Sequence, residues 1–112
     1  MTSDAPKITE LVDEVDTTQK LVDATLKVKT DLTFANAKLY EQIFGGYLDR
    51  TARDICLDLS EVRYVDSTGI SLLVQLSKAL EERGSLLILQ NLQEGVLKVL
   101  EMLKLDRVIR IA

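Results

Sequence analysis

The stretch YVDSTGI, residues 64–70, lies where one hydrophobic pattern ends and another begins. The apolar run ICLDL at 55–59 precedes it, and apolar residues at helical spacing follow it over 70–83, so a strand ends upstream and a helix starts downstream. Small polar residues at such a junction suit an N-cap, where a side-chain oxygen accepts a backbone N–H that has no helical partner. We predict that the helix begins at Asp66 or Ser67, and that Gly69 lets another backbone approach its first turn.

The residues alone leave two interpretations of Ser67. Serine is a common N-cap residue, which makes a plain cap the more frequent case. The N-terminus of a helix also carries partial positive charge and favours an anion, so a serine hydroxyl there is also suited to receive a phosphate.

Length and charge limit the size of the fold and the kinds of partner. A chain of 112 residues is long enough for one domain and no more. Its net charge of −4 and its scattered Lys and Arg residues disfavour binding to nucleic acid or to anionic membranes. We find no signal peptide and no membrane-spanning run, and we expect a cytoplasmic protein that does not insert into a membrane.

The composition leaves little material for catalysis. The chain has no histidine and one cysteine, Cys56, which excludes Ser-His-Asp and Cys-His sites, zinc sites built on histidine or several cysteines, and a disulfide within the chain. The carboxylate pair Glu81-Glu82 falls on a predicted helix surface and indicates a solvated face. We therefore expect no enzymatic activity, no catalytic residue and no metal site, with Cys56 as a small buried residue of a central strand.

The chain upstream of the junction begins with a polar segment and an ambiguous one. Residues 1–7 include the single proline and are typical of a flexible tail. Residues 8–15 have apolar positions at helical spacing, although the segment is short. Alternation of apolar and polar residues over 22–29 then predicts a strand with one buried face.

A polar turn at 30–33 follows this strand and can cap the next helix. One face of that helix is apolar and predicts core residues, namely Tyr40, Ile43, Phe44 and Tyr47. The pair Gly45-Gly46 indicates a helix break near its end, because glycine destabilises a helix by about 1 kcal/mol relative to alanine.

The chain downstream of the junction predicts a further strand and helix. Gly84 suits the C′ position that ends the first helix, and the apolar run at 86–89 predicts a strand. Asn91 and Glu94 have the spacing of a capping box for the next helix, which Leu105 closes, and 108–111 predicts a short last strand. This order of elements indicates an α/β fold with a largely parallel sheet covered by helices.

Several of these segments together resemble one family. They are LDLS at 57–60, VDSTG at 65–69, Leu72-Leu73, Arg83-Gly84, the strand at 86–89, Asn91, VLEML at 99–103 and LDR at 105–107. Over roughly residues 20–112 the sequence is similar to the STAS domain, and more narrowly to the bacterial anti-sigma factor antagonists. The resemblance implies a single STAS-like domain over 8–112, with a four- or five-stranded mixed, largely parallel sheet and about three to four helices, mostly on one side. It also implies an edge strand at 8–15, against the helical spacing there.

The resemblance implies a regulatory function. Ser67 matches the serine that an anti-sigma factor with serine kinase activity phosphorylates with ATP, with Thr68 as the second choice, and a serine phosphatase reverses the step. The unphosphorylated form binds the anti-sigma factor and releases the sigma factor. The chain itself is then expected to be a monomer without a cofactor, since the partner kinase uses the ATP, and Ser67 both caps the helix and carries the phosphate.

The partner is expected at the carboxyl end of the sheet, because the turn at 30–33 and the helix at Ser67 both follow parallel strands. The expected partner-binding residues are Asp31, Thr33, Asp66, Ser67, Thr68 and Gly69.

Two features depart from the family pattern. Relatives often carry Gly-Glu-Leu-Asp after the second strand, whereas this chain has Thr30-Asp31-Leu32-Thr33, so Thr33 replaces the last acid. The segment LTFANA at 32–37 resembles the matching stretch of STAS domains attached to anion transporters. An alternative function is therefore an accessory or ligand-binding subunit of a membrane transporter or of a stress-sensing complex.

Overall fold

The computed structural model describes residues 11–15, 22–50 and 54–112, which form one five-stranded mixed sheet in the order β1-β2-β3-β4-β5. β1 is antiparallel to β2, and β2 to β5 are parallel to one another. The strands are β1 Val12–Val15, β2 Val22–Val28, β3 Asp54–Asp58, β4 Leu87–Gln90 and β5 Arg110–Ile111. The predicted α/β class and the mixed, largely parallel sheet are confirmed.

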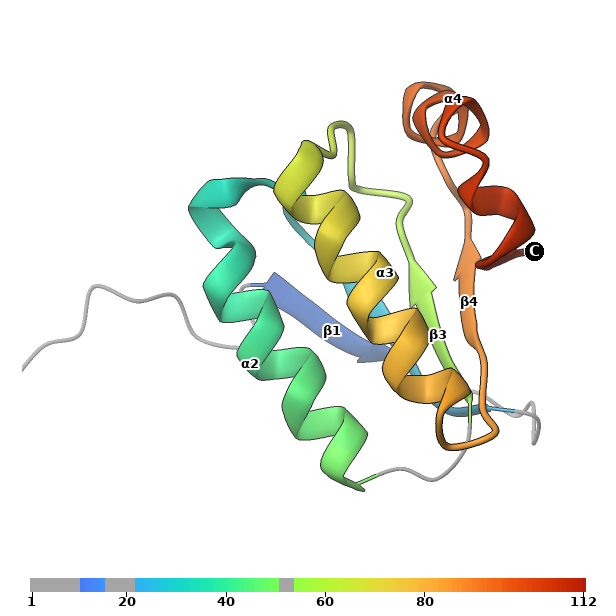
Figure 1. The fold of residues 1–112 in the computed structure, drawn as a ribbon. Helices are drawn as coiled ribbons and strands as arrows, with labels where there is room; N and C mark the ends of the chain where they lie inside the picture. The colour runs from blue at the N-terminus through green and yellow to red at the C-terminus, as the bar shows by residue number, and fades with distance from the viewer. Residues whose placement is uncertain (1–10, 16–21, 51–53) are drawn as a thin grey trace, which may run out of the picture.

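Helices α2 (Phe34–Arg50) and α3 (Ser67–Glu81) lie side by side across one face of this sheet (Figure 1). Helix α4 (Glu94–Met102) lies beyond the carboxyl end of β4, and the short 3₁₀ helix η1 (Leu105–Arg107) leads into β5. Helices α2, α3 and α4 all begin at the end of the sheet where their preceding strands finish (Figure 1). That end therefore collects three helix N-termini, whose first N–H groups need partners outside the helix.

The core fills the space between the sheet and the two covering helices. Leu26 and Leu57 from the strands and Tyr40 and Leu73 from the helices are completely buried. Tyr40 stacks on Phe44 with ring centroids 5.6 Å apart. The predicted apolar face of α2 is confirmed, since Ile43 is buried as well and Tyr47 is partly buried against the core.

β3 is the central strand of the sheet and is buried on both faces. Ile55 and Leu57 belong to the core under α2 and α3, and successive side chains of a strand point to opposite faces. Cys56 therefore lies on the other face, where it is still only 6% exposed. This burial, helped by the charge of Asp58, raises the pKa of the Cys56 thiol to about 11.

Gly84 ends α3 as predicted. Its φ is +75°, its N–H donates to the carbonyl of Glu81, and the N–H of Ser85 donates to the carbonyl of Leu80. These two bonds form a Schellman motif with Gly84 at C′.

Two local predictions about helices are wrong. Helix α2 runs through Gly45 and Gly46 without a break and ends only at Arg50, because packing of its apolar face outweighs the low helix propensity of glycine. Asn91 has a φ of 58° and belongs to the turn after β4, so the capping box with Glu94 does not form. The N-cap position is Gln93, which makes no side-chain cap hydrogen bond.

The ends of the chain refine the predicted bounds. The expected edge strand at 8–15 is present as Val12–Val15, and Leu11 directly precedes it. Residues 8–10 and the tail at 1–7 lie outside the described residues. Helix α4 stops at Met102 rather than at Leu105, since Lys104 has a φ of 60°. The last strand is limited to Arg110–Ile111.

Candidate functional site

Two loops meet at the carboxyl end of the sheet. The β2–α2 loop (residues 29–33) and the β3–α3 loop (residues 59–66) pair through a parallel bridge between Leu32 and Val65. The N–H of Leu32 donates to the carbonyl of Tyr64 over 3.1 Å, and the N–H of Asp66 donates to the carbonyl of Leu32 over 3.1 Å. The prediction that the turn at 30–33 and the start of α3 share one end of the sheet is confirmed.

Asp66 caps two helices at once. Its Oδ1 accepts the N–H of Gly69 over 2.9 Å in the first turn of α3. Its Oδ2 accepts the N–H of Phe34 over 2.9 Å, and Phe34 is the first residue of α2. The hydrogen bonds from Gly69 and then Phe34 favour the ionised carboxylate, so they lower the pKa of Asp66.

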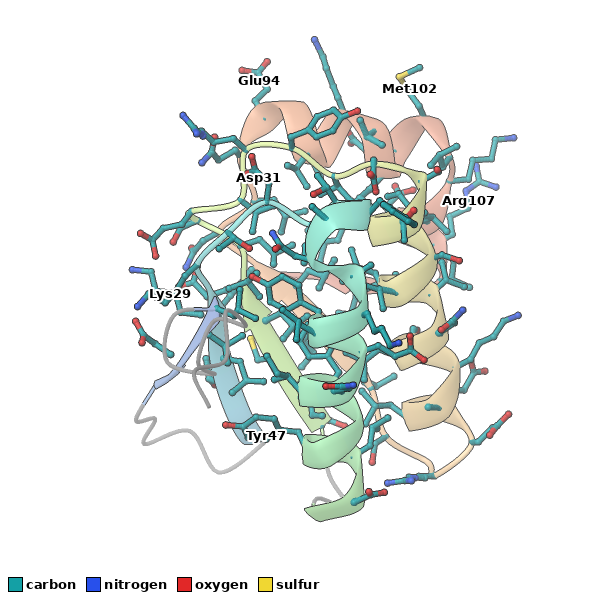
Figure 2. All side chains as sticks on the ribbon, turned by 90° about the vertical axis from the view of Figure 1, so that its left-hand side faces the viewer. Lys29, Asp31, Tyr47, Glu94, Met102 and Arg107 are labelled. Carbon is teal, nitrogen blue, oxygen red and sulfur yellow. The ribbon has the colours of Figure 1, made fainter. Side chains whose placement is uncertain are left out.

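Asp31 makes the reciprocal contact from the other loop. Its Oδ1 accepts the N–H of Arg63 over 2.8 Å and the N–H of Tyr64 over 3.2 Å. Figure 2 shows Asp31 on the loop at the upper end of β2, below the end of α4 that carries Glu94. Asp31 therefore binds two backbone N–H groups of the β3–α3 loop, and Asp66 binds the first N–H of α2, directly after the β2–α2 loop.

Gly69, in the first turn of α3, lies directly against the β2–α2 loop. A Cβ added at Gly69 would lie 2.1 Å from the carbonyl oxygen of Leu32, far inside any normal contact. The prediction that Gly69 admits another backbone is confirmed, and that backbone is Leu32 of the β2–α2 loop.

Ser67 is the first residue of α3 and is exposed. Its hydroxyl has no hydrogen-bond partner in the part of the chain that the structure describes. The prediction that Ser67 also caps the helix is wrong, because the Asp66 carboxylate is the cap. Thr68 is half-buried, so Ser67 is the more accessible of the two hydroxyls.

Thr33 directly precedes α2 and is half-buried. Its carbonyl accepts the N–H of Asn36 over 3.0 Å, while Asp66 binds the N–H of Phe34 from the other loop. The structure thus places the six predicted residues Asp31, Thr33, Asp66, Ser67, Thr68 and Gly69 together, on or directly beside two joined loops. Their roles in phosphorylation and partner binding stay predictions.

The sequence analysis missed two exposed aromatic residues at this site. Phe34 is 80% exposed and Tyr64 is 60% exposed. In the sequence, Phe34 falls at the start of a predicted helix, and Tyr64 begins the motif that contains Ser67. The signal that could have identified both as exposed is an aromatic residue beside a polar loop motif.

Other chemistry is sparse over the described ranges. No group of three His, Cys, Asp or Glu residues within 11–15, 22–50 and 54–112 could hold a metal ion. Within the same ranges, no helix has the length and apolar character needed to span a membrane.

The family model for the STAS domain matches residues 14–112. The chain belongs to the STAS domain family. A candidate anti-sigma factor antagonist from Thermotoga maritima is 30% identical over 95 residues, which cover 82% of this chain and 84% of that protein. The crystal structure of a candidate anti-sigma factor antagonist from Thermotoga maritima superposes on this STAS domain with a TM-score of 0.72, at 29% identity, over 82% of this chain and 81% of that one.

Two further structures carry the same fold. The mouse anion transporter Slc26a9 matches this STAS domain with a TM-score of 0.65 and 25% identity, over 75% of this chain but 14% of the transporter. The unphosphorylated anti-sigma factor antagonist SpoIIAA matches with a TM-score of 0.71 over 90% of this chain and 87% of that one. Its identity is 16%, so SpoIIAA supports the fold and not the residues of the site. The proteins named as anti-sigma factor antagonists are regulatory.

Proposed function

We propose that this STAS domain is an anti-sigma factor antagonist that is switched by phosphorylation of Ser67. In this proposal the unphosphorylated form binds an anti-sigma factor with serine kinase activity, and the sigma factor is released. The kinase transfers a phosphoryl group from its ATP to Ser67, and a serine phosphatase removes it. The domain contributes the acceptor hydroxyl and the binding surface, and it holds no cofactor of its own.

The observation that carries the proposal is the placement of Ser67. Its hydroxyl is exposed at the first position of α3, at the carboxyl end of a parallel sheet, where open α/β sheets bind their ligands. Because Asp66 provides the cap, the Ser67 hydroxyl is not needed to hold the helix. A kinase can therefore modify it without removing a structural hydrogen bond.

A phosphate on Ser67 meets two opposing local effects. It adds a charge of about −1.5 to −2 at neutral pH, which the N-terminus of α3 favours by up to about 2 kcal/mol. The adjacent Asp66 carboxylate repels it. Neither effect is large beside the about 5–15 kcal/mol that holds a domain together, so the phosphate acts at the interface.

At the interface the phosphate is costly. An anti-sigma factor shaped for a neutral hydroxyl would have to bury an unpaired charge, which costs about 2–5 kcal/mol. That range corresponds to a loss of roughly thirty- to several-thousand-fold in affinity. The predicted switch is therefore a change in affinity between two folded states.

The test compares three forms of the protein against one purified anti-sigma factor by calorimetry. Ser67→Ala is expected to bind as the unmodified protein does and to resist phosphorylation, whereas the phosphorylated protein binds far more weakly. Incubation with the kinase and ATP, followed by mass mapping, locates the phosphate at Ser67 or Thr68. Equal affinities for Ser67→Ala and the phosphorylated form contradict the switch.

A second candidate function is that of an accessory or ligand-binding subunit for a membrane transporter or a stress-sensing complex. Two observations favour it: the similarity to the STAS region of Slc26a9 and the transporter-like segment at 32–37. Co-purification from native membranes discriminates the two functions. A permease or transport ATPase as the stable partner supports the second, and an ATP-binding anti-sigma factor supports the first.

A further inference from the structure

The aromatic residues of this chain divide into a buried set and an exposed pair. The chain has three tyrosines, two phenylalanines and no tryptophan. Tyr40 and Phe44 are buried and Tyr47 is half-buried, whereas Phe34 is 80% exposed and Tyr64 is 60% exposed. Both members of the exposed pair lie at the joined loops beside Ser67.

The same two residues are those that the cross-loop carboxylates hold. The N–H of Phe34 donates to Asp66 Oδ2 over 2.9 Å, and the N–H of Tyr64 donates to Asp31 Oδ1 over 3.2 Å. Each aromatic residue is therefore fixed at its backbone by the other loop, while its ring remains in solvent. Neither ring is needed to fill the core.

An exposed aromatic residue with a fixed backbone is well suited to a binding role. Aromatic residues are enriched among the few side chains that carry most of the energy of an interface. Fixing their backbone beforehand reduces the ordering cost of binding. Tyr64 precedes Ser67 by three residues, and the N–H of Phe34 is bonded to Asp66, the residue directly before Ser67.

We propose that Phe34 and Tyr64 are a docking pair that anchors the anti-sigma factor on this domain, an inference that rests on the proposed function. The partner presents apolar pockets for the two rings around a surface that accepts the neutral Ser67 hydroxyl. The docking pair supplies affinity, and the state of Ser67 decides whether that affinity is realised. The partner is assigned as a protein of this kind because the docking pair adjoins the loop that leads into Ser67, the group that the proposed kinase modifies.

The structure provides a matched control. Met102 is also 80% exposed, but it lies on α4, and Figure 2 shows it well separated from Asp31 of the β2–α2 loop. Met102→Ala therefore removes a comparable exposed apolar side chain from a different element. Because Phe34, Tyr64 and Met102 are all solvated, substitutions there are expected to leave the melting temperature nearly unchanged.

The experiment is a calorimetric titration of Phe34→Ala, Tyr64→Ala, Phe34→Trp and Met102→Ala with the purified anti-sigma factor kinase. Phe34→Ala and Tyr64→Ala are expected to lose about thirty-fold or more in affinity, as interface anchors do. Phe34→Trp is expected to retain binding, and Met102→Ala to bind as the unmodified protein does. With the kinase and ATP, the KM for Phe34→Ala as substrate rises, while its rate of phosphorylation at saturation stays within about twofold, because a docking residue acts on binding and not on the transfer step.

The outcomes separate this inference from the proposed function. Unchanged affinity for both alanine variants, with phosphorylation of Ser67 still weakening binding, overturns the docking pair and leaves the switch intact. Loss of affinity in the alanine variants, with no effect of phosphorylation, supports the docking pair and contradicts the switch. If the unmodified domain binds no anti-sigma factor, both proposals fail, because the docking pair is assigned to that partner.

Discussion

The carboxylate of Asp66 lies 2.9 Å from the backbone nitrogen of Phe34, so the residue that caps α3 also binds the first amide of α2. Because one side chain serves two helix N-termini, its ionisation affects the stability of both. Asp31 returns the contact through Arg63 and Tyr64. The end of the sheet that carries Ser67 is thus held by carboxylate-to-backbone bonds that cross between the loops.

Asp66 is expected to contribute to stability in a pH-dependent way. The hydrogen bonds from Gly69 and Phe34 lower its pKa in the folded state, below the value of about 3.9 for an unfolded aspartate. The unfolded chain therefore binds the proton first as the pH falls. The stabilisation is complete above about pH 3.9 and is lost as the pH falls through the folded pKa.

Urea unfolding at pH 7 and at several acidic values measures this contribution. Asp66→Asn is expected to be less stable than the unmodified protein at pH 7 and to lose less stability on acidification. Asp106→Asn is the control, because Asp106 is exposed and accepts no hydrogen bond from the described residues of the two loops. An identical acid dependence in Asp66→Asn and the unmodified protein would falsify the assigned cap.

Asp31 is expected to matter for stability as well as for partners. Asp31→Ala removes the acceptor for the N–H groups of Arg63 and Tyr64, and bonds to a charged acceptor contribute about 1.5–3 kcal/mol when well formed. Since these bonds are exposed, we expect a loss of about 1–2 kcal/mol in the free energy of unfolding. Chemical denaturation of Asp31→Ala and Asp31→Asn checks this, and Asp31→Asn, which keeps one acceptor oxygen, should lose less. Unchanged stability in both variants contradicts the structural role.

Gly69→Ala adds one methyl group and is expected to destabilise the site strongly. The added Cβ would lie 2.1 Å from the carbonyl oxygen of Leu32, which is backbone and cannot rotate away. Overpacking of this kind costs about 1–3 kcal/mol, occasionally more, and here it also separates the two loops.

The control for Gly69 comes from α2. Gly45 and Gly46 have nothing within 4 Å of an added Cβ, so Gly45→Ala and Gly46→Ala are expected to stabilise the domain by up to about 1 kcal/mol each. Thermal unfolding of the three variants gives opposite signs if the structure is right. A Gly69→Ala protein as stable as the unmodified one means that the loops do not approach this closely.

The order of the elements could be predicted from the sequence because each signal is local. Alternation over 22–29, the continuous apolar run before Ser60 and the C′ position of Gly84 each depend on residues within a few positions of one another. The close approach at Gly69 was predictable for the same reason, although its partner Leu32 was not. The family resemblance was needed to assign a strand at Val12–Val15 against its helical spacing.

The pairing of the loops could not be predicted, since its bonds join residues far apart in the chain. Nothing near Asp66 indicates that the N–H of Phe34 needs an acceptor, and nothing near Asp31 indicates that it binds the N–H of Tyr64. The choice of Asp66 over Ser67 as the cap follows from that pairing, because Asp66 has two oxygens and serves two helices. The prediction of Asn91 as a cap was wrong for a simpler reason. Asparagine also tolerates a positive φ, and Asn91 adopts a positive φ in the turn after β4.

Cys56 is expected to react slowly with thiol reagents in the native state. The thiolate is the reactive species, and burial of Cys56, with Asp58 nearby, raises its pKa to about 11, so little thiolate forms at pH 8. Labelling with a maleimide should become fast once the protein is unfolded in urea, since a free cysteine has a pKa of about 8.5. Equal labelling rates in the native and unfolded states would contradict the burial of Cys56 in the central strand.

The last prediction concerns the fold of the charged form of Ser67. Ser67→Glu and Ser67→Gln differ by one charge and little in size, so their comparison isolates the effect of charge at the first position of α3. The helix N-terminus stabilises the added charge by about 0.3–1 kcal/mol, and repulsion from Asp66 offsets part of that gain. We expect superimposable circular dichroism spectra and free energies of unfolding that agree within about 1 kcal/mol. A Ser67→Glu protein that is several kcal/mol less stable than Ser67→Gln would mean that a negative charge at this position unfolds the loops. In that case a phosphate on Ser67 and the Asp66 carboxylate could not both occupy the N-terminus of α3. If the two variants have the same stability, the charge of a phosphate on Ser67 acts on partner binding and not on the fold.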